Sequence, residues 1–223
     1  MLTARLILER FDKDNKLLEK REQPSRSFLF QFIELLYVAH AQIEAAGPYT
    51  MNDITDVART VDSESYQHYA KANLMIGSPP GQSGVLCIYR EGVNIVFRPY
   101  QATIEGEKIG IVIGTGNAAV TPTDVALQTR VLHGTQAGRF EYGGCELISI
   151  AFADPNGQFT IRRYFTNNSG GAITVEEVGL YSVGTDYNGY FAWPFCIARD
   201  LTGGVAVANT ELLRATYVVQ ITV

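Results

Sequence analysis

The sequence predicts a mainly β protein: an antiparallel β-sandwich of jelly-roll type, with an N-terminal β-hairpin and one amphipathic helix. From about residue 85 onward, short apolar runs recur with turn residues between them, which is typical of two-layer β architectures. The chain also contains 12 Tyr and 11 Phe, which pack well on pleated surfaces. Hydrophobic residues make up 46% of the chain and charged residues 18%, so a substantial core can form.

The predicted N-terminal hairpin comes first in the chain. Residues 4–11 alternate loosely and predict a strand, residues 12–15 predict a turn, and residues 16–21 predict the returning strand. The turn does not match a calcium loop, because Lys16 and Leu17 stand where an EF-hand needs an oxygen ligand and a glycine.

The predicted helix covers residues 27–46, with Ser25 or Ser27 as its N-terminal cap and Gly47 and Pro48 as its stop signal. One apolar stripe consists of Phe28, Phe32, Leu35, Leu36, Ala39 and Ile43. A second stripe consists of Phe30, Ile33, Tyr37 and His40. A helix that is exposed on one side needs a single stripe, so either another subunit covers the second stripe or the helix lies wholly inside one core.

These elements suggest two units. Residues 1–84 would hold the hairpin, the helix and a connecting region used for assembly, and residues 85–223 would form the sandwich. Residues 85–89 and 93–97 predict the first strands of that sandwich, and residues 109–113 predict the next one.

A glycine-rich turn follows residues 109–113. Residues 114–119, GTGNAA, formally match the dinucleotide fingerprint G-x-G-x-x-A. That fingerprint requires a helix opening at the glycines, whereas here Thr121, Pro122 and Asp124 predict a later, short helix that ends near Arg130. We therefore expect a tight glycine turn and not a nucleotide site.

Two hairpins are predicted in the second half of the chain. Residues 147–152 and 159–165 flank the strong turn sequence DPNG at residues 154–157. The second hairpin covers residues 159–182 and turns at residues 167–171, which tolerate positive φ. Its second strand carries adjacent carboxylates, Glu176 and Glu177, which alternation places on opposite faces, and the apolar parity changes there, which suggests a bulge.

The sequence carries no recognisable catalytic or metal-binding motif. Its three histidines and three cysteines lack the spacing of a zinc site or a disulfide framework. Cys145 follows two glycines, but a thiol nucleophile needs a base that the sequence does not place, so a structural thiol is expected. We therefore expect no enzyme activity, no catalytic residues, no metal and no cofactor.

Charge and hydropathy limit the partners. The formal net charge is −5 and no basic stripe occurs, which argues against nucleic-acid binding. No apolar run reaches about 18 residues and no signal-peptide pattern opens the chain, so we expect cytoplasmic synthesis and no membrane partner.

Three segments resemble, in the same order, a group of tailed-bacteriophage virion proteins. They are residues 109–127 (IGIVIGTGNAAVTPTDVAL), 165–181 (FTNNSGGAITVEEVGLY) and 198–217 (ARDLTGGVAVANTELLRATY). In that group a glycine turn with T-P-x-D precedes an FTN-x-S-G hairpin, an E-x-G-L-Y/F strand and a closing R-D strand pair. The resemblance implies a non-enzymatic β-sandwich component of the virion, and it leaves open whether the protein sits on the head, neck or tail.

Two functional hypotheses remain. The first is a structural virion protein, such as a capsid decoration or a head- or tail-associated component, which docks in many copies on capsid or tail subunits and forms a homo-oligomer. Its predicted interface residues are Phe30, Ile33 and Tyr37. The alternative is a receptor- or carbohydrate-binding module of a phage tail. Its predicted stacking surface is an aromatic loop at residues 186–194, with Tyr187, Tyr190, Phe191 and Trp193.

Overall fold

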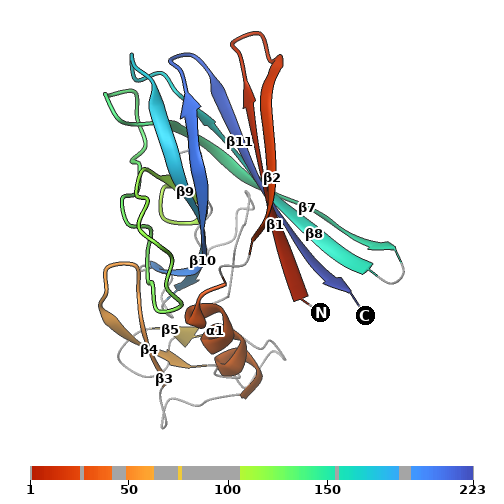
Figure 1. Cartoon of the computed structure of the whole chain (residues 1–223). Helices are drawn as coiled ribbons and strands as arrows, with labels where there is room; N and C mark the ends of the chain where they lie inside the picture. The colour runs from red at the N-terminus through yellow and green to blue at the C-terminus, as the bar shows by residue number, and fades with distance from the viewer. Residues whose placement is uncertain are drawn as a thin grey trace, which may run out of the picture.

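A five-stranded antiparallel sheet forms the larger layer of the protein (Figure 1). The computed structural model describes residues 2–25, 28–41, 49–62, 75–76, 106–153, 156–185 and 192–222. The strand order in this sheet is β2-β1-β11-β8-β7. Its strands are β1 (Leu2–Phe11), β2 (Leu17–Ser25), β7 (Glu141–Ala153), β8 (Asn156–Thr166) and β11 (Leu212–Thr222).

A three-stranded antiparallel sheet forms the second layer, in the order β10-β9-β6. Its strands are β6 (Gly110–Gly114), β9 (Ile173–Thr185) and β10 (Ala192–Val207). Fully buried side chains of both sheets meet in one hydrophobic core, including Leu6, Ile161 and Phe165 from the larger sheet and Leu180 and Phe195 from the smaller one. The predicted fold class, an antiparallel β-sandwich, is confirmed.

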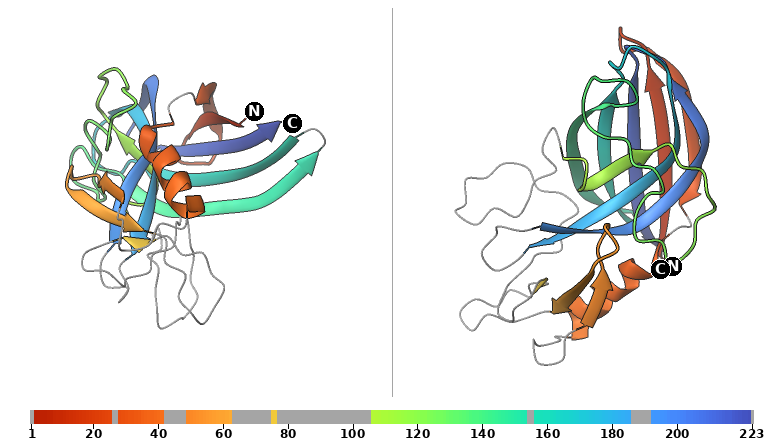
Figure 2. Two further views of the ribbon diagram at one scale, coloured as in Figure 1. Left: turned by 90° about the horizontal axis from the view of Figure 1, so that it is seen from below. Right: turned by 90° about the vertical axis from the view of Figure 1, so that its left-hand side faces the viewer.

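A smaller unit lies at one end of the sandwich (Figures 1 and 2). It contains α1 (Phe30–Ala41) and a sheet of β3 (Tyr49–Asn52), β4 (Ala58–Asp62) and β5 (Met75–Ile76). Two backbone hydrogen bonds fix α1 to the rest of the protein: Leu29 N donates to Ile197 O at 3.0 Å, and Phe30 N donates to Pro122 O at 2.9 Å. The described part of the predicted helix thus begins at Phe30 and extends to Ala41, and residues 42–48 lie outside the described residues.

The N-terminal hairpin forms as predicted, but it belongs to the sandwich. β1 pairs with β2 on one side and with β11 along its whole length on the other, from Leu2 opposite Ile221 to Phe11 opposite Leu212. The two ends of the chain therefore lie side by side (Figure 1). This pairing corrects the predicted division at residue 84, because sequence alternation identifies a strand but not its distant partner.

The predicted hairpin over residues 159–182 is wrong in its pairing. β8 pairs with β7 and β11 in the larger sheet, whereas β9 pairs with β6 and β10 in the smaller sheet. The turn between them is an arch that carries the chain from one layer to the other. The other predicted hairpin, β7 with β8, is confirmed.

Asn167, which is fully buried, holds this arch together. Its Nδ2 donates to the carbonyl oxygens of Gly171 and Val207, both at 2.8 Å, and its Oδ1 accepts from Ser169 N at 3.1 Å. The side chain thereby replaces backbone pairing that a hairpin would have supplied.

The bulge predicted near Glu176 lies on the neighbouring strand. β10 shifts register between Leu201 and Val205, where three of its residues stand opposite Glu176. Apolar residues stop alternating with polar ones in β9 because both faces of the strand are buried from Glu177 to Ser182. The strands predicted at residues 85–89 and 93–97 lie outside the described residues.

We expect Leu180→Ala to lower the free energy of unfolding by about 2–5 kcal/mol, because Leu180 is 1% exposed and its truncation leaves a cavity between the sheets. Urea unfolding of the two proteins measures this difference. Leu18→Ala is the control, because Leu18 is 43% exposed and its truncation should cost far less. Equal losses in the two variants would contradict the assignment of Leu180 to the core.

Candidate functional site

A buried carboxylate lies at the centre of the smaller sheet. Glu177 of β9 is 0% exposed, and its two oxygens accept four hydrogen bonds from different parts of the chain. Oε1 accepts from Thr129 N at 2.8 Å and from Gly116 N at 3.2 Å. Oε2 accepts from Gln128 N at 3.0 Å and from Arg199 Nε at 2.7 Å. Four donors satisfy the hydrogen-bonding capacity of this buried carboxylate, which offsets the cost of its burial.

Arg199 of β10 balances this charge. It pairs in register with Gly179, which makes Glu177 its diagonal neighbour on the adjacent strand. Its Nη1 lies 2.6 Å from Asp124 Oδ2, and its Nη2 donates to Ala118 O at 3.0 Å. Burial would lower the pKa of Arg199, but the hydrogen bonds and charges of Glu177 and Asp124 outweigh it and raise the pKa.

The glycine turn therefore surrounds a carboxylate of its own chain. The amide of Gly116 points at Glu177, where a nucleotide-binding turn would direct its amides at a phosphate. A Cβ on Gly114 or on Gly116 would lie 2.6 Å from Glu177 Oε1, so close approach explains both glycines. The expected tight turn does not form: residues 115–119 are an irregular loop with a single bend at Ala118, and neither Gly114 nor Gly116 has a positive φ. We keep the name glycine turn for residues 114–119.

The short helix predicted from Thr121 to Arg130 does not form. Asp124 does accept from Thr121 N at 3.0 Å and from Thr121 Oγ1 at 2.6 Å, as at a helix start. The following amides of Gln128 and Thr129, however, bind Glu177 and not carbonyl oxygens of a helix. The segment instead consists of turns and bends, and its residues 127–129 are bonded to Tyr181 and Glu177 of β9.

A second buried cation closes the sandwich on the side of β6 and β7. Arg163 is 0% exposed, and it donates to the carbonyl oxygens of Ile109, Ile111 and Gly143 at 2.8–3.0 Å. Its guanidinium lies 4.8 Å from the ring centre of Tyr142, and burial lowers its pKa. Its neighbour Arg162 instead forms an ion pair with Glu146, so strand alternation places the two arginines on opposite faces of β8.

Three of the predicted interface residues share one exposed face of α1. Phe30 is 58% exposed, Ile33 is 61% exposed and Tyr37 is 56% exposed. The opposite face packs inward: Leu35 is 1% exposed, and Phe28, just before α1, stacks on Phe32 at 4.6 Å. The interpretation of α1 as wholly buried is therefore wrong. We call Phe30, Ile33 and Tyr37 the α1 stripe.

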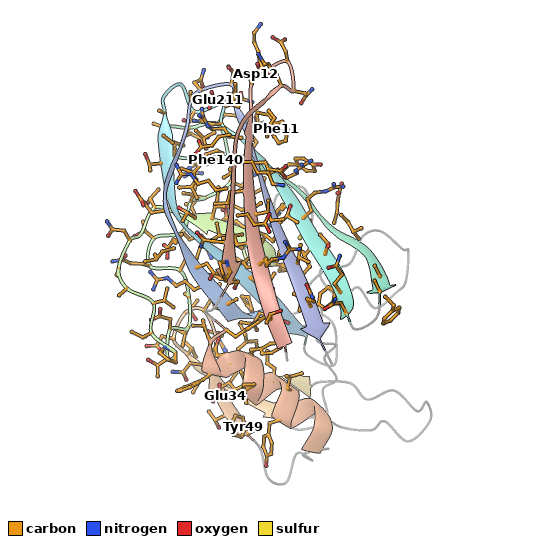
Figure 3. All side chains as sticks on the ribbon, turned by 45° about the vertical axis from the view of Figure 1, so that its right-hand side comes forward. Phe11, Asp12, Glu34, Tyr49, Phe140 and Glu211 are labelled. Carbon is orange, nitrogen blue, oxygen red and sulfur yellow. The ribbon has the colours of Figure 1, made fainter. Side chains whose placement is uncertain are left out.

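Contacts with β3 hold the α1 stripe in place. Tyr49 Oη donates to Glu34 Oε1 at 3.0 Å, and Figure 3 shows these two residues together at the lower end of the protein. The rings of Tyr37 and Tyr49 meet edge to face at 5.9 Å. The stacking surface predicted for the aromatic loop is not described: Tyr187, Tyr190 and Phe191 lie outside the described residues, as does the side chain of Trp193.

The described cysteine thiols are buried, and the described histidine is hydrogen-bonded within the fold. Cys145 and Cys196 are buried, and burial raises the pKa of both thiols. His133 Nδ1 accepts from Tyr142 N at 3.1 Å, which occupies that ring nitrogen. Within the described ranges, no group of three or more His, Cys, Asp or Glu side chains could hold a metal ion. Cys87 and His68, and the side chain of His40, lie outside those ranges.

Sequence reasoning missed the network of Glu177, Arg199 and Asp124. Each of its members lies in a different one of the three segments that resemble phage virion proteins, at residues 109–127, 165–181 and 198–217. The occurrence of these three segments in the same order was the signal in the sequence that could have indicated the network. Which charged residues meet, however, depends on the pairing of β9 with β10.

The chain matches no protein-family model, and neither a curated protein nor a solved structure matches it. In the part of the chain that the structure describes, no helix is long and apolar enough to cross a membrane.

We expect Gly116→Ala to lower the free energy of unfolding by about 1–3 kcal/mol, since the new methyl group would overlap Glu177 and Gln128. Gly144→Ala is the matched control, because a Cβ there meets nothing within 4 Å. Denaturant unfolding measures both. If Gly116→Ala is as stable as the wild type, Gly116 is not needed for the close approach to Glu177. If the wild type binds NAD or ATP at micromolar concentration and Gly116→Ala does not, the turn is a nucleotide site.

We expect acid to remove the stabilising effect of Asp124. Burial alone would raise the pKa of Asp124, but hydrogen bonds from Thr121 and Arg199 lower it below its ordinary value of 3.8. A lowered pKa in the folded state contributes stability above the unfolded pKa, and this contribution is lost as pH falls through the folded pKa. Asp124→Asn should therefore be less stable than wild type at neutral pH, and the difference should shrink below pH 3.8. Urea unfolding across pH tests this, and a difference independent of pH would contradict it.

Proposed function

We propose that this chain is a non-enzymatic structural protein of a tailed-phage virion, which docks in multiple copies on capsid or tail subunits through the α1 stripe. The observation that carries the proposal is the exposure of Phe30, Ile33 and Tyr37 along one face of α1. Contiguous apolar surface of this kind usually marks a partner site, and aromatic residues contribute most to interface energies.

The setting of α1 supports its role as a docking element. Its first turn is bonded to β10 through Ile197 and to the turn at Pro122, and its inner face packs on the core. The α1 stripe is therefore presented by a scaffold that does not need to reorganise, which lowers the entropic cost of association. A stripe held rigidly on each copy suits repeated, identical contacts with a symmetric particle.

The sequence resemblance supports the virion assignment. Its three segments supply Asp124, Glu177 and Arg199, which together fix the glycine turn on the sandwich. The three similar segments thus each supply one charged residue to a single stabilising network. Such a network agrees with a protein whose role is that of a rigid body. The buried thiols and saturated carboxylate agree with a non-enzymatic role.

We expect the double variant Phe30→Ser, Tyr37→Ser to fold normally and to be lost from phage particles. Both side chains are more than half exposed, so the fold should lose only the edge contact of Tyr37 with Tyr49, worth about 0.5–1.5 kcal/mol. Circular dichroism measures folding, and purified particles assembled in the presence of tagged protein measure incorporation.

Phe152→Ser is the matched control, since Phe152 is 78% exposed and lies on β7, outside the α1 stripe. It should be incorporated like the wild type. If the double variant is folded and incorporated normally, the α1 stripe is not the docking surface. If the wild type itself never enters particles, the virion assignment fails.

A further inference from the structure

A cavity lies where the smaller unit meets the sandwich. Its volume is about 370 Å³, within the range of small-ligand sites. The turn between β3 and β4 forms one wall, and Ile54 N of that turn donates to Pro194 O of β10 at 3.0 Å. Residues 126–132, which follow the glycine turn, supply another wall, with the apolar side chains of Leu127 and Leu132.

Asp53 carries the one carboxylate among the described residues that line the cavity, and its oxygens are already hydrogen-bonded. Asp53 Oδ2 accepts from Arg59 Nε at 2.7 Å, and Asp53 Oδ1 accepts from the amides of Thr55 at 2.8 Å and Val57 at 3.3 Å. Burial alone would raise the pKa of Asp53, but these hydrogen bonds lower it. Asp53 is thus a charged, saturated group that neutralises Arg59 and is not available to the other cations of the cavity.

Arg130 has unused donor capacity at this cavity. It stands opposite Gly114 at the edge of β6, where Val131 N donates to Ile113 O at 2.9 Å. Its Nε is buried and has no hydrogen-bond partner. Its Nη2 lies 3.9 Å from Glu107 Oε1, a long contact, and the other oxygen of Glu107 accepts from His133 N. Because Nε itself is buried, an acceptor in the cavity would meet the Nη groups, which make no hydrogen bond within the described residues, while the side chain as a whole is 24% exposed.

Two further donors line the same cavity. Lys108 is exposed, and in the described part of the chain it has no ion pair. The hydroxyl of Tyr181 accepts from Leu127 N at 2.8 Å and keeps its own proton for donation. Burial raises the pKa of Tyr181, so this proton is retained at neutral pH. The described lining of the cavity therefore includes an arginine, an exposed ammonium group and a phenol that is 1% exposed, while its carboxylate is neutralised.

We propose that this cavity binds an oxyanion, a carboxylate or phosphate group of a small organic molecule, through Arg130, Lys108 and Tyr181. Guanidinium and ammonium groups are the usual protein partners of such anions, and charge-assisted hydrogen bonds are stronger than neutral ones. The apolar walls from Leu127 and Leu132 would contact the carbon body of the ligand. This site is independent of the α1 stripe and of the proposed virion role.

Titration of the full chain with sodium succinate and, separately, with sodium phosphate tests the proposal at ionic strength held constant with chloride. We expect saturable binding of at least one anion by calorimetry, with amide shifts in residues 126–132 in ¹⁵N-resolved NMR spectra. The tighter of the two identifies carboxylate or phosphate as the preferred group. Arg130→Met should weaken binding roughly tenfold or more, and Lys108→Met by roughly threefold or more.

Lys13→Met is the matched control, because it removes the same charge from the exposed tip of the N-terminal hairpin. It should bind like the wild type. The proposal is overturned if neither anion binds saturably, or if Lys108→Met and Arg130→Met bind as the control does. Lys108→Met alone decides the matter if Arg130→Met does not fold, since Lys108 is exposed and should not be needed for folding.

Discussion

The buried pair of Glu177 and Arg199 is the interaction on which the rest of the smaller sheet depends. Removing two charges from water costs several kcal/mol each, and only full hydrogen bonding offsets that cost. Here Glu177 receives four donors, and Arg199 reaches two carboxylates and a carbonyl oxygen. The pair therefore specifies one position for the glycine turn, one path for residues 121–130 and one register between β9 and β10.

Hydrogen bonds from buried or partly buried side chains also close the sandwich at its edges. On one side Arg163 and Tyr142 of the larger sheet reach carbonyl oxygens of residues 109–113 and 131. On the other side Gln23 of β2 donates to Leu201 O of β10 at 2.7 Å. Between the layers, Ser25 and Tyr217 both bond Asp200 Oδ2, at 2.7 and 2.9 Å. Side chains thus satisfy backbone groups that would otherwise be exposed strand edges, which are prone to aggregation.

The candidate functional surfaces lie together at one end of this scaffold. The smaller unit lies at one end of the sandwich (Figure 1). It carries the α1 stripe, and the cavity proposed to bind an oxyanion is shared by that unit and residues 126–132. The sandwich contributes rigidity and the smaller unit contributes surface. This division differs from the predicted one at residue 84, because the N-terminal hairpin serves the scaffold and only the part that follows it presents the surfaces.

The sequence by itself determined the local elements. Alternation located β1, β2, β7 and β8, and helical spacing located α1 and the face that remains exposed. These signals are local, since they arise from the period of a strand or a helix. Tertiary structure decided which strands pair and which charges meet. The turn at residues 167–171 has the composition of a hairpin, yet it crosses between layers because Asn167 replaces the missing backbone bonds. Residues 121–130 carry a helix start signal, yet remain turns because Glu177, distant in sequence, takes their amides. A local pattern cannot predict that Glu177 takes these amides from a helix, because Glu177 reaches them only once β9 is in place.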